Sequence, residues 1–128
     1  MTTISKDTEN VEFHVKGWGH EVWMANCELY CGKQLVVYRN LKCSVHYHKL
    51  KNETFFLADG LIRMAVWEAP FELGYPTECN TFLMHPGDRL VLPPNTPHQF
   101  TGVDPKSTII EISTQHFEED SYRIQRGD

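Results

Sequence analysis

Three histidines and one glutamate stand at spacings that could gather them around a single divalent metal ion. His46 and His48 flank Tyr47, Glu53 opens the next apolar run, and His98 ends a proline-rich segment much later in the chain. Three neutral imidazoles and one carboxylate suit Mn, Fe, Co, Ni or Zn better than Ca or Mg, which prefer oxygen ligands. A six-coordinate ion would keep two positions for water or a bidentate substrate. The alternative is that these histidines are ordinary half-buried residues.

These four residues can meet only if strands carry them to one place. Side chains alternate along a β-strand, so His46 and His48 share one face and can point into a barrel together. Glu53 can join them from the following strand, and His98 follows a turn that would fix its direction. Asn95 suits that turn because asparagine tolerates left-handed backbone better than most residues. The sequence therefore predicts one open metal site built from two clusters.

Short runs rich in β-branched and aromatic residues alternate with turn-forming residues along the chain. The predicted strands cover residues 33–39, 43–48, 53–59, 61–67, 81–85, 89–93, 98–100 and 107–113. Asp59-Gly60 predicts a tight hairpin, residues 68–80 a surface loop, and residues 115–128 a helical turn. Many short strands in a small domain are typical of a sandwich or barrel, so the predicted fold class is all-β.

The composition is that of one ordered globular domain. The chain has 128 residues, of which 41% are hydrophobic and 23% charged, and this predicts a single domain over 1–128 with a polar segment at about 1–12. The net charge of −5 comes without a basic stripe, so nucleic acid and membrane surfaces are not expected as partners. The N-terminal segment is polar, so we do not expect it to be a signal peptide, and no cysteine pair has Cys-x-x-Cys spacing. We therefore expect reduced thiols and a cytoplasmic location.

The two clusters resemble the two sequence motifs of the cupin superfamily. The first motif, a His-x-His pair followed by a glutamate and a glycine, is met from His46 to Gly60, although Leu41 or a neighbour replaces its leading glycine. In the second motif, Asn95 stands where glycine is usual and Gly102 where asparagine is usual, and neither departure touches a ligand position. The resemblance implies a single-domain cupin, a double-stranded β-helix or jelly-roll barrel, whose metal ligands would be His46, His48, Glu53 and His98.

Other segments resemble the cupin-type D-lyxose isomerases and the isomerase domain of type II phosphomannose isomerases. For the lyxose isomerases they are YCGKQLV, KNETF, PGDRLVLPPNTPHQF and EISTQHFEEDSYRI, and for the phosphomannose isomerases KGWGHEVW and the C-terminal stretch. The resemblance implies a metal-dependent aldose–ketose isomerase that acts on a sugar or sugar phosphate of the lyxose or mannose type through a metal-chelated enediol. We also expect a homodimer, because cupins often cover exposed sheet edges in this way.

An isomerase of this kind needs a base, and Glu111 is the best candidate. It interrupts an apolar strand, so we expect it to face the barrel lumen, where desolvation would raise its pKa. A solvent-facing position at a strand edge is the alternative. Lys33 could hold a substrate oxygen or assist proton transfer, or it could be a solvated lysine at a strand end. Lys51 is expected to be exposed in a charged turn.

Further residues are candidates for contact with the substrate. Arg63 and Arg89 could line the mouth of the barrel or lie on its outer face. The cations form no cluster in the sequence, which favours a free sugar over a phosphorylated one. Aromatic residues could wall a sugar pocket, although most of them belong to the core in a small barrel. The aromatic candidates are Trp18, Trp23, Tyr30 and Phe100.

Two other functions fit the same four ligands. Fe(II) or Ni(II) held by them would serve a cupin dioxygenase, but the polar Glu111 and Lys33 argue against one because oxygenase pockets tend to be more apolar. A non-catalytic cupin would keep the ligands to bind sugar or to stabilise itself, and would form no product.

Overall fold

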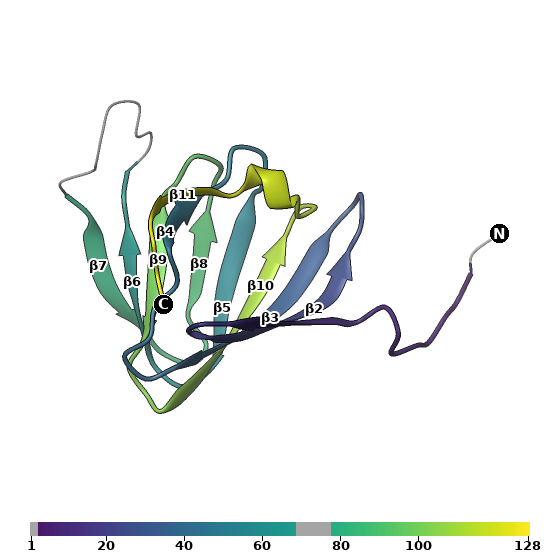
Figure 1. The fold of residues 1–128 in the computed structure, drawn as a ribbon, viewed down its shortest axis with the longest axis horizontal. Helices are drawn as coiled ribbons and strands as arrows, with labels where there is room; N and C mark the ends of the chain where they lie inside the picture. Colours follow the sequence, from purple (N-terminus) through teal and green to yellow (C-terminus); the bar gives the residue numbers. More distant parts are fainter. Residues whose placement is uncertain (1–2, 69–77) are drawn as a thin grey trace.

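The computed structural model describes residues 3–68 and 78–128, which form two antiparallel sheets facing each other (Figure 1). The six-stranded sheet has the order β1 (Glu12–Lys16), β2 (Gly19–Asn26), β3 (Cys31–Tyr38), β10 (Lys106–Ser113), β5 (Glu53–Asp59) and β8 (Arg89–Leu92). The five-stranded sheet has the order β11 (Tyr122–Gln125), β4 (Val45–Tyr47), β9 (His98–Gly102), β6 (Ile62–Val66) and β7 (Asn80–Met84). The predicted all-β, jelly-roll architecture is confirmed.

The predicted strands match β3 to β10, and the structure adds three more. β1 and β2 form a hairpin at one edge of the six-stranded sheet, and β11 lies at an edge of the other sheet. These edge strands mix polar and apolar residues on both faces, so their alternation is weak in the sequence. The predicted helical turn near the C-terminus is the short 3₁₀ helix η1 (Glu118–Asp120). Most of the loop predicted at 68–80 lies outside the described residues.

The turn at Asp59-Gly60 does not form the predicted hairpin. In the described part of the chain, β5 pairs with β10 and β8, whereas β6 pairs with β7 and β9 in the other sheet. Gly60 has φ +92°, and a Cβ there would lie 2.2 Å from Ser107 Oγ. The sequence identified a turn at this position, but the hairpin predicted from it is wrong. The turn carries the chain from one sheet to the other, since β10 and β8 occupy the two sides of β5.

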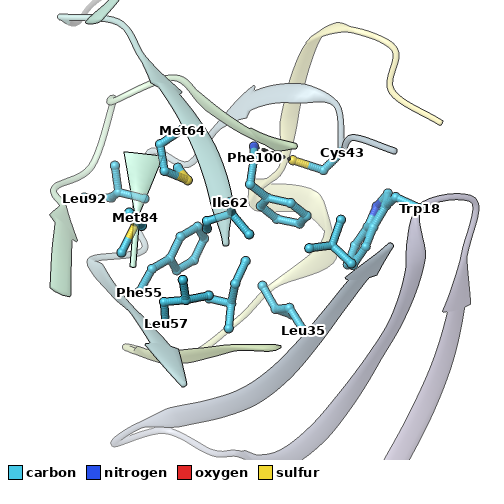
Figure 2. Packing of buried hydrophobic residues seen from close by; sticks show 12 residues of the cluster. Trp18, Leu35, Cys43, Phe55, Leu57, Ile62, Met64, Met84, Leu92 and Phe100 are labelled. Atoms are coloured by element: carbon cyan, nitrogen blue, oxygen red, sulfur yellow. Dashed lines mark hydrogen bonds between the residues drawn. The ribbon is translucent and has the colours of Figure 1, made fainter. Parts of the chain in front are cut away.

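A hydrophobic core fills the space between the two sheets (Figure 2). Its side chains come from both sheets, and burying each large one contributes about 1.5–3 kcal/mol. The lumen-facing side chains of β3 and β10 change between charged and apolar along each strand. On β3 the buried Lys33 is followed two residues later by the buried Leu35, and on β10 the buried Ile109 stands two residues before the buried Glu111. The lumen is therefore apolar at one end and charged at the other. The buried cluster comprises Trp18, Leu35, Val37, Cys43, Phe55, Leu57, Ile62, Met64, Met84, Leu92, Phe100 and Ile109.

No helix in the described residues has the length and apolar character needed to cross a membrane.

Candidate functional site

The three predicted histidines converge at the polar end of the lumen. His46 on β4 lies opposite His98 on β9 in the sheet register, and His48 follows two residues after His46 on the same side of the chain. Their ligand atoms all lie within 4.8 Å of one another, and the ring centroids of His46 and His98 are 4.5 Å apart. This group could hold a metal ion, as the spacing predicted.

Glu53 reaches the same group from β5, in the opposite sheet. Its Oε1 lies 2.9 Å from His98 Nε2 and its Oε2 lies 3.8 Å from His48 Nε2. The carboxylate is 2% exposed, and neither of its oxygens nor His98 Nε2 makes a hydrogen bond of regular geometry. Buried polar atoms are normally satisfied, because a buried group without a partner is costly. A cation bound between these atoms would satisfy all of them, so the residues present fit a divalent metal.

Backbone carbonyls orient all three imidazole rings. In each ring Nδ1 lies within hydrogen-bonding distance of a carbonyl oxygen, which can only accept, so Nδ1 carries the proton and donates. This tautomer leaves the Nε2 lone pair free, which is the form in which histidine binds metals. The three contacts are His46 Nδ1 to Ser44 O (2.9 Å), His48 Nδ1 to Asp120 O (2.9 Å) and His98 Nδ1 to Thr96 O (2.8 Å).

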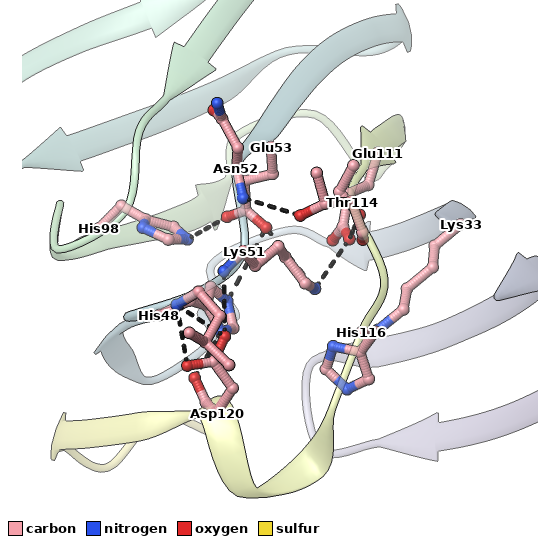
Figure 3. A network of polar contacts seen from close by, with 12 residues as sticks. Lys33, His48, Lys51, Asn52, Glu53, His98, Glu111, Thr114, His116 and Asp120 are labelled. Atoms are coloured by element: carbon pink, nitrogen blue, oxygen red, sulfur yellow. Dashed lines mark hydrogen bonds and ion pairs between the residues drawn. The ribbon is translucent and has the colours of Figure 1, made fainter. Parts of the chain in front are cut away.

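Asp120 in η1 holds the turn that follows His48. Its buried carboxylate accepts hydrogen bonds from the backbone N–H groups of Lys49, Leu50 and Lys51, at 2.9 to 3.2 Å. Figure 3 shows this contact beside His48. Asp120 thus fixes the direction of the turn through its carboxylate and the His48 ring through its backbone carbonyl, and the sequence alone did not reveal this role.

The two departures from the cupin motif have structural explanations. Asn95 has φ +63°, a backbone conformation that asparagine tolerates better than most residues, and its N–H donates to the His48 carbonyl at 2.6 Å. At Gly102 a Cβ would lie 2.3 Å from the Tyr38 carbonyl oxygen, so the close passage of two strands requires glycine there. Both residues preserve the backbone that positions His98.

The charges in the group influence one another strongly. Burial lowers the pKa of His46 and of His48. Burial also acts to lower the pKa of His98, but the neighbouring Glu53 carboxylate outweighs it and raises that pKa. Burial opposes ionisation of Glu53, yet His98 and the other nearby cations lower its pKa overall. Metal binding would therefore compete with a proton on His98.

Glu111 lies in the lumen beside the histidines, as predicted. It is 5% exposed, and its Oε2 accepts hydrogen bonds from Lys51 Nζ at 3.0 Å and Ser113 Oγ at 3.1 Å. Burial, reinforced by the negative charge of Glu53, raises the pKa of Glu111, although Lys51 and Lys33 oppose the shift. The expected lumen position is confirmed, and burial there acts on the pKa in the expected direction.

The expectation that Lys51 is exposed is wrong. The side chain is 2% exposed, and its Nζ lies 3.0 Å from Glu111 and 3.7 Å from Glu53 (Figure 3). Burial acts to lower its pKa, but the two carboxylates outweigh burial and raise it. Asp120 folds the turn so that Lys51 points into the lumen. Its two-residue spacing from Glu53 was the signal that could have revealed this, because residues so spaced share a face.

Lys33 is also buried, so the solvated alternative is wrong. It is 3% exposed, with Nζ 4.1 Å from the centre of the Trp23 ring and 3.8 Å from the Glu21 carboxylate. Burial lowers its pKa, and Glu111 acts in the opposite direction. Lys33 faces Glu111 directly in the pairing of β3 with β10.

A cavity of about 340 Å³ opens onto these groups. Its lining includes His46, His48, Lys33, Lys51 and Glu111, and does not include Glu53 or His98. Aromatic side chains form part of the wall, as predicted for Trp18, Trp23 and Phe100. The cavity thus joins the candidate metal group to a charged pair and to an apolar wall.

Three predicted substrate-binding residues do not reach this cavity. Tyr30 is 58% exposed in the connection between β2 and β3. Arg63 is exposed between the lumen-facing Ile62 and Met64, and Arg89 is likewise exposed on the outer side of β8, so strand alternation turns both arginines away from the lumen. The cations that do line its outer part are Lys16, Arg123 and Arg126.

Comparisons with known proteins agree with this architecture. No family model matches the chain. A D-lyxose ketol-isomerase from Thermofilum sp. (strain ex4484_79) is 29% identical over 110 residues, which cover 73% of this chain and 61% of that protein. The chain therefore spans less than two thirds of the length of this relative.

Solved structures show the same fold at low sequence identity. The capsular polysaccharide assembling protein CapF from Staphylococcus aureus matches with a TM-score of 0.77 at 13% identity, over 92% of this chain and 35% of CapF. Oxalate decarboxylase from Bacillus subtilis matches with a TM-score of 0.76 at 12% identity, over 97% of this chain and 33% of the decarboxylase. KdgF from Halomonas sp. matches with a TM-score of 0.67 at 16% identity, over 84% of this chain and 91% of KdgF. The chain has the cupin fold and resembles a D-lyxose ketol-isomerase.

Proposed function

We propose that this chain is a metal-dependent aldose–ketose isomerase acting on a sugar of the lyxose or mannose type. The observation that carries the proposal is the placement of the buried Lys51–Glu111 pair in the same cavity as the histidine group. The proposed metal ligands are His46, His48, Glu53 and His98. The likeness to a D-lyxose ketol-isomerase supports the class of reaction.

The chemistry requires a proton to move between two adjacent carbons while negative charge on oxygen is stabilised. A divalent metal in this group would act as a Lewis acid toward two neighbouring substrate oxygens. Glu111 is the proposed base, because its raised pKa brings a carboxylate closer to neutral pH, where it can both take and return a proton. The ammonium groups of Lys51 and Lys33 lie nearby and can donate hydrogen bonds to substrate oxygens.

The cavity suits one sugar molecule. A volume of about 340 Å³ lies within the range of small-molecule sites, and its lining combines aromatic walls with a few polar groups. Lys16, Arg123 and Arg126 line the outer part together with Glu118 and Asp128, so positive and negative charges are mixed there. We therefore propose a free sugar as the first substrate to test, with its phosphate ester as the comparison.

The test combines metal analysis with an isomerase assay. Protein loaded separately with Mn, Co, Ni or Zn is incubated with D-lyxose and other free and phosphorylated aldoses, and ketose formation is measured. We expect close to one metal ion per chain, lost in the His46→Ala, His98→Ala double variant. The Glu111→Gln variant should keep the bound metal, and its kcat should fall by about 10²–10⁴-fold.

Three results would contradict the proposal. A protein that binds none of these metals would remove the site itself. Stoichiometric metal with sugar binding but no ketose from any aldose would favour a non-catalytic sugar-binding cupin. Oxygen consumption with a diketone or flavonol, without sugar conversion, would favour a dioxygenase. The homodimer and the cytoplasmic location remain predictions, and light scattering in solution tests the first.

A further inference from the structure

His116 lines the cavity and has one ring nitrogen without a hydrogen-bond partner. Its side chain is 8% exposed and belongs to the cavity lining. The ring uses Nε2 for a contact with Glu118 Oε1 at 3.2 Å, whereas Nδ1 is buried and has no hydrogen-bond partner. Buried polar atoms without partners are rare in proteins, so this nitrogen requires an explanation.

The contact with Glu118 determines which ring nitrogen carries the proton. A carboxylate can only accept, so Nε2 donates to it, and the neutral ring then has a lone pair on Nδ1. Burial, together with the positive charges of Lys51 and Lys33, lowers the pKa of His116 to about 4. The ring is therefore neutral at physiological pH, and Nδ1 is a hydrogen-bond acceptor.

The ring is held in place from a distant part of the chain. The His116 N–H donates to Asn26 Oδ1 at 2.8 Å, and Asn26 Nδ2 donates to the His116 carbonyl at 3.1 Å. The ring packs edge-on against Trp23, with the centroids 5.0 Å apart. These contacts tie the segment after β10 to β2, so the acceptor on Nδ1 is fixed before any ligand arrives.

The surroundings of His116 suit a polyhydroxy ligand next to the candidate metal group. Figure 3 shows His116 beside Lys33, with Lys51 between these two and His98. The His116 ring lies 6.3 Å from the His48 ring, and Glu21 also lines the cavity. An ammonium donor, a carboxylate acceptor and an imidazole acceptor on one wall can bind hydroxyl groups at several positions.

We propose that His116 is a substrate-binding residue whose Nδ1 accepts a hydrogen bond from a sugar hydroxyl remote from the reacting carbons. The class of ligand rests on the function proposed above. A hydroxyl bound here would orient the sugar chain while its other end lies at the histidine group. A sugar lacking that hydroxyl would leave the buried nitrogen unpaired and would bind more weakly.

Two substitutions separate the two nitrogens of the ring. His116→Gln places an amide nitrogen near the position of Nε2, so it keeps the donor to Glu118 and removes the acceptor. His116→Asn places a side-chain oxygen near the position of Nδ1, so it restores the acceptor. Binding of D-lyxose and of the other aldoses to metal-loaded protein is measured by calorimetry, beside KM and kcat.

We expect about tenfold weaker sugar binding and a similar rise in KM for His116→Gln, with kcat little changed. His116→Asn should lie within about threefold of the wild type in both quantities. Metal content and the unfolding midpoint of each variant show whether the fold and the metal group are intact. A purely structural role would lower the midpoint of both variants and would not separate their affinities.

The outcomes distinguish this inference from the proposed isomerase activity. Sugar binding without turnover, weakened in His116→Gln, would contradict the isomerase and support the role of His116. Turnover with equal affinities in the wild type and His116→Gln would overturn the role of His116 and leave the isomerase standing. Equal losses in the two variants, or a wild type that binds none of the sugars, would also overturn the inference.

Discussion

Replacing Lys51 by methionine should expose the energetic cost of the charges buried in the lumen. The substitution keeps most of the apolar volume and removes the ammonium that lies 3.0 Å from Glu111 and 3.7 Å from Glu53. At an effective dielectric constant of about 20, these distances correspond to gross attractions of roughly 5.5 and 4.5 kcal/mol. Desolvation offsets much of this, and removing one partner of a buried pair typically costs about 3–5 kcal/mol. We expect a loss of about 3 kcal/mol at pH 7.

Urea unfolding of the metal-free protein measures this loss. The matched control is Lys49→Met in the same turn, where the lysine is exposed and its Nζ lies 4.4 Å from the centre of the Tyr122 ring. Losing that contact should cost about 0.5–1 kcal/mol. The double variant Lys51→Met, Glu111→Gln should recover part of the loss, because it removes the carboxylate left without a partner.

The pH dependence provides a second check on the same substitution. Burial raises the pKa of Glu111, and loss of the Lys51 ammonium removes one of the charges that oppose this shift. As the pH falls, the folded variant takes up a proton on Glu111 before the unfolded chain does, because a glutamate in the unfolded chain stays ionised down to about pH 4.3. The deficit of Lys51→Met should therefore shrink on acidification. A loss at pH 7 no larger than that of Lys49→Met would refute the reasoning.

Three further predictions concern the turn, the cavity histidine and the metal. Gly60→Ala should lower the unfolding free energy by about 1–2 kcal/mol for the left-handed backbone, and further for the clash with Ser107. Gly87 also has a positive φ (+94°) but open space around it, so Gly87→Ala should cost only the backbone term. Equal urea midpoints for the two variants would contradict this. Acidification from pH 6.5 to 4 should lower the unfolding free energy of the wild type by up to about 3 kcal/mol through His116, because this histidine takes up its proton at a higher pH in the unfolded chain than in the folded one. Denaturant unfolding at a series of pH values should show a smaller loss for His116→Gln. A divalent metal at about 100 times its Kd should raise the unfolding free energy by about 2.7 kcal/mol, and calorimetric scans should show no such gain in His46→Ala.

The metal-ligand candidates could be predicted from the sequence because the spacing within each cluster is local, whereas the fold brings the two clusters together. Alternation puts His46 and His48 on one face whatever strand lies beside them, and the proline-rich turn presents His98 at the start of its own strand. Glu111 was expected in the lumen because it interrupts an apolar strand, and the structure decided between that position and the solvent-facing alternative. Asn95 was predicted to adopt left-handed backbone, and its φ of +63° confirms this.

The residues that were wrongly predicted depend on contacts between distant segments. Lys51 was expected in solvent, and it is buried because Asp120, 69 residues later, folds its turn inward. Arg63 and Arg89 were candidates for the cavity, but the pairing of their strands directs them outward. The hairpin of β1 and β2 was missed because its residues are mostly exposed or half-buried and do not alternate clearly, and its place is set by the pairing of β2 with β3.

By itself, the sequence determined the alternation of each strand, a turn at Asp59-Gly60, the left-handed backbone at Asn95, and the set of metal-ligand candidates. These are local properties, set by the chain's geometry over a few residues. Only the tertiary structure decided which face of each strand looks into the lumen, which strand lies next to β5, and that Lys51 and His116 border the cavity. Those outcomes depend on pairing between segments far apart in the chain, for which no short stretch of sequence carries the information.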